Sequence, residues 1–158
     1  MIKLKIYIDT SVFGGIFDIE DPVRVDVTKQ VLNILRLREK YIPYISNIVI
    51  EETEKAPVEI KHKLKQIIED TKCEIFYESD ECIELVDEFM KQKVVPKKSR
   101  DDARHVAVAT VNNVDIILTW NCRHLANIEK KRMINSISIM LGYKQIDIVT
   151  PLEVVGYG

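Results

Sequence analysis

Residues 115–120 read Asp115-Ile116-Ile117-Leu118-Thr119-Trp120, with no charged side chain after Asp115. An unbroken apolar run of this length is typical of a strand that is buried on both faces of a parallel sheet. A helical pattern precedes it over 99–112. Another follows over 128–141 and ends at Gly142, a residue type that commonly terminates helices. A strand with a helix before and after it in the chain predicts an α/β fold.

The rest of the chain continues this alternation. Further strands are predicted at 4–8, 43–45, 74–77 and 146–149, and further helices at 22–41, 47–55, 57–70 and 80–91. The alternation predicts a three-layer α/β/α fold, in which a central, mostly parallel sheet has helices on both faces. No linker or repeat divides the 158 residues, so we expect a single domain over 1–158.

The composition excludes several classes of protein. Apolar residues make up 46% and charged residues 30%, which is ordinary globular usage and rules out disordered or collagen-like chains. The net charge of -2 argues neither for nor against a nucleic-acid partner. No apolar run reaches the roughly 18 residues of a membrane helix, and the N-terminus lacks a signal-peptide pattern, so we expect a cytoplasmic location. Cys73, Cys82 and Cys122 show no C-x-x-C spacing and are expected to be core or half-buried side chains.

Polar side chains follow two of the predicted strands. Asp9 comes directly after 4–8, and Asn121 comes directly after 115–120. Ligands of open α/β sheets bind beyond the carboxyl ends of the strands, so both positions are candidates for a site. Asp115 begins its strand, about 16 Å from the other end at roughly 3.3 Å per residue, and is not expected to join them. The alternative role for Asp9 is to cap a helix that begins at Thr10.

Two glutamates lie side by side on the predicted helix 47–55. Residues three and four apart share a helix face, so Glu52 lies with the apolar Ile48 and Val49, whereas Glu51 lies on a polar face. An inward-looking carboxylate needs a partner or a cation. Glu52 is therefore the candidate and Glu51 is expected to be solvated. The alternative for Glu52 is a place at the edge of its face, turned toward water.

Asp102 stands in the first turn of the helix predicted over 99–112. Ser99 and Asp102 fit the S-x-x-[DE] capping pattern, and the helix dipole favours an acid there. The residues alone leave open whether Asp102 caps its own helix or lies at the same sheet edge as Asp9. Basic residues near Asp102 and after Asn121 are interpreted either as solvated faces or as contacts for a phosphate backbone. They are Lys91, Lys93, Lys97, Lys98, Arg100 and Arg104, and then Arg123, Lys130, Lys131 and Arg132.

The histidines match no catalytic motif. His105 is expected to face solvent or to pack within its helix, His62 to lie on the surface, and His124 to reach at most the edge of a site. The chain contains no Ser-His-Asp order and no G-x-x-x-x-G-K-[ST], H-E-x-x-H or G-x-G-x-x-G pattern. A phosphatase with a nucleophilic aspartate would carry a second aspartate two residues after Asp9, where this chain has Ser11.

Four segments stand in the order that is found in PIN-domain proteins. They are Tyr7-Ile8-Asp9-Thr10-Ser11, Ser46-Asn47-Ile48-Val49-Ile50-Glu51-Glu52, Asp102-Ala103-Arg104-His105-Val106-Ala107-Val108-Ala109 and Ile117-Leu118-Thr119-Trp120-Asn121. Over roughly 5–150 the chain resembles this family, in particular the VapC-like ribonucleases, which are the toxins of toxin–antitoxin pairs. The resemblance implies a PIN-like fold and a metal-dependent endoribonuclease that hydrolyses RNA phosphodiesters.

The resemblance also implies the site. Carried over residue by residue, it assigns Asp9, Glu52 and Asp102 to a Mg²⁺ or Mn²⁺ ion and to catalysis. The fourth acid of the family is Asn121 here, whose amide oxygen can still ligate a hard cation, and the number of ions, one or two, stays open. The segment 125–143 looks longer than in the compact toxins. An RNA substrate, a protein antitoxin and a homodimer are further implications, and no membrane partner is expected.

Elementary electrostatics supports a cation independently of the resemblance. Two carboxylates about 4 Å apart repel by about 4 kcal/mol at an effective dielectric near 20. A divalent ion with oxygen ligands relieves this repulsion and makes a bound water acidic enough to attack a phosphodiester. The alternative, motivated by Asn121, is a catalytically weakened PIN-like module that binds RNA or a protein.

Overall fold

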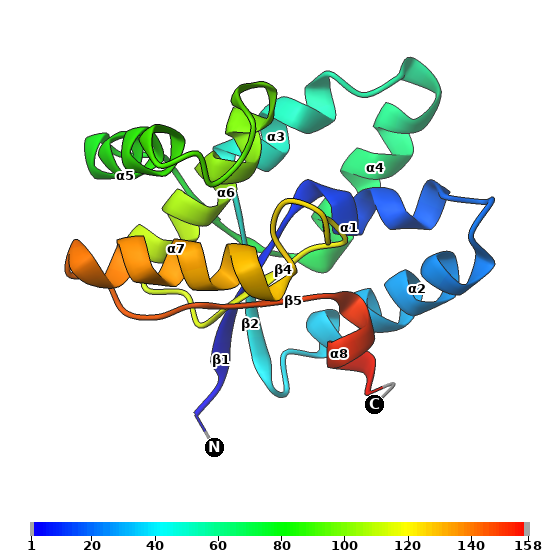
Figure 1. The fold of residues 1–158 in the computed structure, drawn as a ribbon. Helices are drawn as coiled ribbons and strands as arrows, with labels where there is room; N and C mark the ends of the chain where they lie inside the picture. Colours follow the sequence, from blue (N-terminus) through cyan, green and yellow to red (C-terminus); the bar gives the residue numbers. More distant parts are fainter. Residues whose placement is uncertain (1, 157–158) are drawn as a thin grey trace.

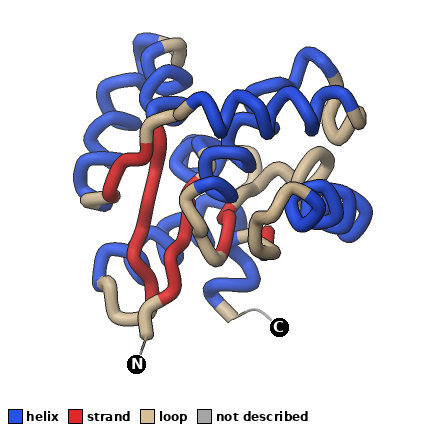
Figure 2. Tube along the Cα trace, turned by 90° about the vertical axis from the view of Figure 1, so that its left-hand side faces the viewer, coloured by secondary structure: helices blue, strands red, loops and turns tan. Residues whose placement is uncertain are grey.

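A five-stranded parallel sheet forms the middle of the computed structural model, which describes residues 2–156 (Figure 1). Its strands are β1 (Leu4–Ile8), β2 (Tyr41–Ser46), β3 (Glu74–Phe76), β4 (Ile116–Leu118) and β5 (Asp147–Val149). They lie in the order β3-β2-β1-β4-β5, and each neighbouring pair is parallel. The carboxyl ends of the strands therefore lie along one edge, toward which β1 runs from the N-terminus (Figures 1 and 2).

Helices cover both faces of this sheet. On one side α2 (Pro22–Leu37) packs against α4 (Val58–Thr71) and α8 (Pro151–Val155); on the other, α5 (Asp80–Lys91) packs against α6 (Arg100–Val111) and α7 (Ile128–Met140) (Figure 1). Shorter helical segments are α1 (Thr10–Gly14), η1 (Gly15–Phe17), α3 (Asn47–Glu54) and η2 (Lys97–Ser99). The predicted three-layer α/β/α fold with a parallel sheet is confirmed.

The order of the strands reverses once. The chain builds β1, β2 and β3 outward in one direction and then crosses back to place β4 on the other side of β1. Right-handed crossovers put the helices before and after this reversal on opposite faces of the sheet. The crevice outside the carboxyl ends of β1 and β4 is consequently a topological switch point, the place where open α/β sheets bind ligands.

Some element boundaries differ from the prediction for local reasons. The helix predicted over 22–41 ends at Leu37, because Arg38 adopts the left-handed conformation with φ 53°. Pro57 is the N-cap of α4 rather than its first residue. The sequence pattern misses the short helix α8, whose first turn is closed when Glu153 accepts a hydrogen bond from the N–H of Thr150.

The cysteines follow the expectation only in part. Cys82 is buried and Cys73 is half-buried, but Cys122 is exposed because it lies in the loop between β4 and α7. Among residues 2–156, no helix is long and apolar enough to cross a bilayer.

Candidate metal centre

Asp9 is the first residue after β1 and lies at the switch point. It is only 5% exposed, and its N–H donates to the carbonyl oxygen of Leu118 in β4 at 3.0 Å. Its Oδ2 accepts hydrogen bonds from Ser11 Oγ at 2.6 Å and from Thr119 Oγ1 at 2.8 Å. Asp9 occupies the N-cap position of α1, yet its side chain makes no capping hydrogen bond. The Asp9 carboxylate therefore does not cap α1, and it makes its contacts at the carboxyl edge of the sheet.

The two hydroxyls that hold Asp9 are themselves held by the chain after β4. The N–H of Trp120 donates to Ser11 Oγ, and the N–H of Asn121 donates to Thr119 Oγ1, each at 3.0 Å. Backbone on one side of the crevice therefore orients a carboxylate on the other. This arrangement turns the second oxygen of Asp9, Oδ1, toward α6.

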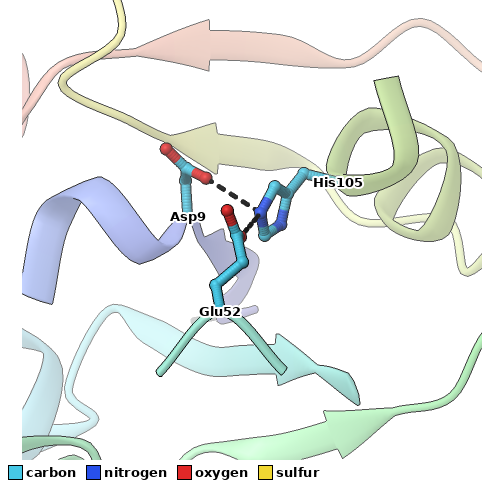
Figure 3. A group of neighbouring side chains, drawn as sticks. All are labelled: Asp9, Glu52 and His105. Atoms are coloured by element: carbon cyan, nitrogen blue, oxygen red, sulfur yellow. Dashed lines mark hydrogen bonds and ion pairs between the residues drawn. The ribbon is translucent and has the colours of Figure 1, made fainter. Parts of the chain in front are cut away.

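Glu52 and His105 meet Asp9 from two different helices (Figure 3). His105 Nε2, on α6, lies 2.5 Å from Glu52 Oε1 and 3.2 Å from Asp9 Oδ1. Glu52, on α3, accepts a further hydrogen bond at Oε1 from Thr10 Oγ1 at 2.8 Å. A single nitrogen of the imidazole thus contacts both carboxylates.

From the sequence we expected His105 to face solvent or to pack within its helix. The structure shows neither, because the buried ring contacts residues of other elements. Its side chain is 1% exposed, and its Nδ1 lies 2.6 Å from the hydroxyl of Tyr7, which in turn lies 2.7 Å from Ser46 Oγ. Burial lowers the pKa of His105, but the charge of Asp9 and the hydrogen bond and charge of Glu52 outweigh burial and raise it. Burial raises the pKa of Tyr7 well above its usual range, so the hydroxyl keeps its proton.

A signal for His105 was present in the spacing. His105 follows Asp102 by three residues, and side chains three residues apart lie on the same face of a helix.

Burial raises the pKa of Asp102. The charge of Asp9 also raises this pKa, whereas the hydrogen bond from His124 lowers it. The side chain of Ser99 makes no capping hydrogen bond, so the structure does not support the capping interpretation of Asp102.

Asn121 and His124 both contact Asp102. Asn121 Nδ2 donates to Asp102 Oδ2 at 3.1 Å, and His124 Nδ1 donates to the same oxygen at 3.0 Å. The sequence placed Asn121 at this edge of the sheet but gave His124 no more than a place at the rim. In the structure the loop after β4 brings both side chains onto a helix that lies before β4 in the chain.

Glu51 points away from this group, as expected. Arg104 Nη2 donates to Glu51 Oε2 at 3.0 Å, and Arg104 also binds Glu78 and Asp101. The guanidinium of Arg104, which the sequence analysis considered as a phosphate contact, is therefore already paired with three carboxylates. Arg100 is likewise paired with a carboxylate of α5 at 3.0 Å. For these two arginines the structure does not support a role as free phosphate contacts.

The donor set fits a divalent cation. One ligand atom from each of Asp9, Glu52 and His105 lies within 4.8 Å of the others. Ligand atoms about 2.1 Å from Mg²⁺ lie about 3.0 Å apart when they are neighbours and about 4.2 Å apart when they are opposite. Small side-chain shifts, chiefly a separation of His105 Nε2 from Glu52 Oε1, would let the three atoms share one ion. Three carboxylates, those of Asp9, Glu52 and Asp102, are contacted by two imidazoles, those of His105 and His124, and the excess of carboxylates favours a cation. Glu52 and Asp102 are 31% and 21% exposed and open the group to solvent.

Solved structures resemble this chain over nearly its whole length. A chain of VapBC2 from Rickettsia felis, bound to a promoter DNA fragment, matches with a TM-score of 0.56 and 13% identity over 93% of this chain and 98% of that one. A chain of DNA-bound VapBC from Salmonella typhimurium matches with a TM-score of 0.56 and 15% identity over 94% and 98%. The fold is VapC-like. The PIN-like fold expected from the four segments is thereby confirmed, and identities this low show the fold alone. No protein-family model and no curated protein matches this sequence.

Proposed function

We propose that this VapC-like chain is a metal-dependent endoribonuclease in which Asp9, Glu52 and Asp102 hold Mg²⁺ or Mn²⁺. The observation that carries the proposal is the meeting of Asp9, which follows β1, with Glu52 of α3 and His105 of α6 at the switch point. Asp102 lies three residues before His105 on α6, and the resemblance adds it to the ligands. A divalent ion bound there would stabilise charge on a phosphodiester and lower the pKa of a coordinated water.

The residues around the acids have separate tasks in this proposal. Ser11 and Thr119 hold one oxygen of Asp9, so the other oxygen faces the group without loss of side-chain entropy on binding. Glu52 is less buried than Asp9 and borders the solvent through which RNA would approach. Asn121 assists from the end of β4 through its contact with Asp102.

Cleavage of a fluorescent single-stranded RNA by the purified full chain tests the proposal. We expect cleavage with Mn²⁺ or Mg²⁺, none with excess chelator, and a rate lower by more than about 100-fold in Asp9→Asn and Asp102→Asn, since loss of outer-shell partners alone costs 10- to 100-fold. Asp115→Asn is the matched control, because Asp115 lies at the amino end of β4 and binds Lys5 and Lys144 there. Full activity in chelator would reject the metal dependence, and equal rates in Asp9→Asn and Asp115→Asn would reject Asp9 as part of the site.

A specific observation favours a second candidate, a catalytically weakened PIN-like module that binds RNA or a protein. The position of the family's fourth acid is an amide, Asn121, whose nitrogen is already used by Asp102. The wild-type chain would then bind the same RNA without cutting it, and Asp9→Asn would leave the affinity unchanged. Cleavage that arises only in Asn121→Asp would support this candidate.

The partners belong to the same proposal. The similar structures are VapBC complexes, and by analogy we assign this chain a protein antitoxin that covers the acidic group. A homodimer and a cytoplasmic location complete the picture of a toxin from a toxin–antitoxin pair. Co-expression with the product of the neighbouring reading frame, followed by size-exclusion chromatography, measures both associations.

A further inference from the structure

Each of the three carboxylates, Asp9, Glu52 and Asp102, has two contacts on one oxygen, and within residues 2–156 only Asp9 has a further contact on its other oxygen, with His105 Nε2. Asp9 Oδ2 accepts two hydroxyls, Glu52 Oε1 accepts a hydroxyl and contacts an imidazole, and Asp102 Oδ2 accepts an amide and an imidazole. Two contacts on one oxygen fix the direction in which a carboxylate presents the other oxygen. The donors to Asp102 differ from the rest, because both come from one loop, the segment 119–127 that follows β4.

The amide of Asn121 is used at both ends. Its Nδ2 donates to Asp102 Oδ2 at 3.1 Å, and its Oδ1 accepts the N–H of His124 at 3.0 Å. An amide matches this environment, since a carboxylate faces its nitrogen and an N–H faces its oxygen. An aspartate here would lack the N–H and would place a negative oxygen about 3 Å from Asp102, a repulsion of several kcal/mol at an effective dielectric near 20. The Asn121 oxygen that could ligate a cation holds the loop instead.

The loop that carries these donors is itself braced. Asn127 Nδ2 donates to the carbonyl oxygens of Cys122 and Arg123 at 2.9 Å, and the N–H groups of Leu125 and Ala126 donate to the carbonyl oxygen of Asn121. Five backbone groups of the turn, three carbonyl oxygens and two N–H groups, are thereby satisfied within it. His124, whose side chain is 20% exposed, is held over Asp102 by this turn rather than by packing in the core.

We infer that Asn121 and His124 are positioning residues that together hold Asp102 toward a single divalent ion, with the Asn121 side chain outside the ligands of that ion. The inference rests on the proposed function, because it concerns the ion that the three acids would hold. The inference gives a role to the amide of Asn121 at the fourth acidic position. In place of a negative charge, this position supplies a hydrogen bond to Asp102. The site therefore lacks the carboxylate that a second ion would need.

Isothermal titration of the full chain with Mn²⁺ tests the inference without relying on activity. We expect one ion per chain in the wild type and a dissociation constant that rises about 10- to 100-fold in His124→Ala, the range for loss of an outer-shell partner. His124→Asn should restore the affinity to within about threefold of wild type, since its amide nitrogen replaces Nδ1 as donor. His62→Ala, which removes an exposed histidine of α4, is the control and should bind as the wild type does.

The outcomes separate the inference from the function on which it rests. Two ions per chain, or an unchanged dissociation constant in His124→Ala, would overturn the inference and leave the nuclease standing. The inference would also be overturned if His124→Asn bound Mn²⁺ as weakly as His124→Ala, because this result would mean that the imidazole itself binds the ion. Wild-type protein that binds no Mn²⁺ at millimolar concentration would remove the proposed function as well. The ion count needs no variant, so it decides even if His124→Ala fails to fold.

Discussion

The imidazole of His105 replaces a repulsion between Asp9 and Glu52 with two attractions. One nitrogen contacts both carboxylates, and the other contacts the hydroxyl of Tyr7. Buried polar atoms that lack partners cost about 1–3 kcal/mol each, so the chain of contacts stabilises the fold as well as arranging the site. At the scale of single residues, satisfied hydrogen bonds hold the charged side chains of the site in place.

A close approach at Gly15 gives a prediction at this scale. A Cβ on Gly15 would lie 2.5 Å from Thr28 Oγ1 and 2.8 Å from Trp120 Nε1, two atoms that are joined by a 3.0 Å hydrogen bond. We expect Gly15→Ala to lower the free energy of unfolding by about 1–3 kcal/mol, the usual cost of overpacking. Urea denaturation followed by circular dichroism measures the change.

Gly14→Ala is the control for that measurement. A Cβ on Gly14 has nothing within 4 Å, and Gly14 lies at the end of α1 with helical φ and ψ. The same substitution should therefore be neutral there, or stabilising by up to about 1 kcal/mol through helix propensity. If both variants lost the same free energy of unfolding, the close approach of the Gly15 Cβ to Thr28 and Trp120 would add no cost of its own.

At the scale of elements, α3 and α6 are joined on two sides. Glu52 and His105 connect them at the site, and Arg104 of α6 connects them outside it through Glu51 of α3. Arg104 also binds Glu78, which accepts a further hydrogen bond from Asn47. The outer connection sets the spacing of the two helices that carry the candidate ligands.

Arg104→Gln tests the outer connection. The variant leaves Glu78, whose side chain is 14% exposed, without its cation, and we expect a loss of about 1–3 kcal/mol in the free energy of unfolding. Arg100→Gln removes a more exposed pair with Asp87 and should cost less than about 1 kcal/mol. Equal losses in the two variants, by urea denaturation at pH 7, would show that the Arg104 contacts do not hold the helices.

At the scale of the whole molecule, the two edges of the sheet carry different chemistry. The carboxyl edge gathers the acids of the candidate site, whereas at the amino edge Asp115 neutralises Lys144 at 2.7 Å and accepts the N–H of Lys5 at 2.8 Å. Burial would raise the pKa of Asp115, but the hydrogen bonds from Lys144 and Lys5 outweigh burial and lower it. The amino edge is thus a source of stability that depends on pH.

The sign of that dependence follows from the lowered pKa. Asp115 binds its proton more weakly in the folded chain than in the unfolded chain, where its pKa is about 3.9. Its stabilisation is complete above that value and is lost as the pH falls through the folded pKa. We expect Asp115→Asn to be less stable than wild type at pH 7 and the difference to shrink steadily as the pH falls below about 3.9, measured by urea denaturation from pH 7 into the acidic range. A difference that stays constant would contradict the assignment.

The sequence by itself determined the layout of the sheet edge. Alternation of apolar runs and helical spacing depends on each residue's near neighbours, so strands, helices and the places of Asp9 and Asn121 after β1 and β4 were predictable. Helical periodicity also separated Glu52 from Glu51. These inferences needed no knowledge of which elements lie side by side.

Only the tertiary structure decided where Asp102 points and what His105 and His124 do. A helical pattern reports which face of a helix is apolar, but not which element covers that face or at which sheet edge the helix begins. The crossing from β3 to β4 sets α6 beside the end of β1, and this brings His105 into contact with Asp9 and Glu52. Contacts between residues about 50 to 100 positions apart arise from the winding of the chain, which local spacing does not encode.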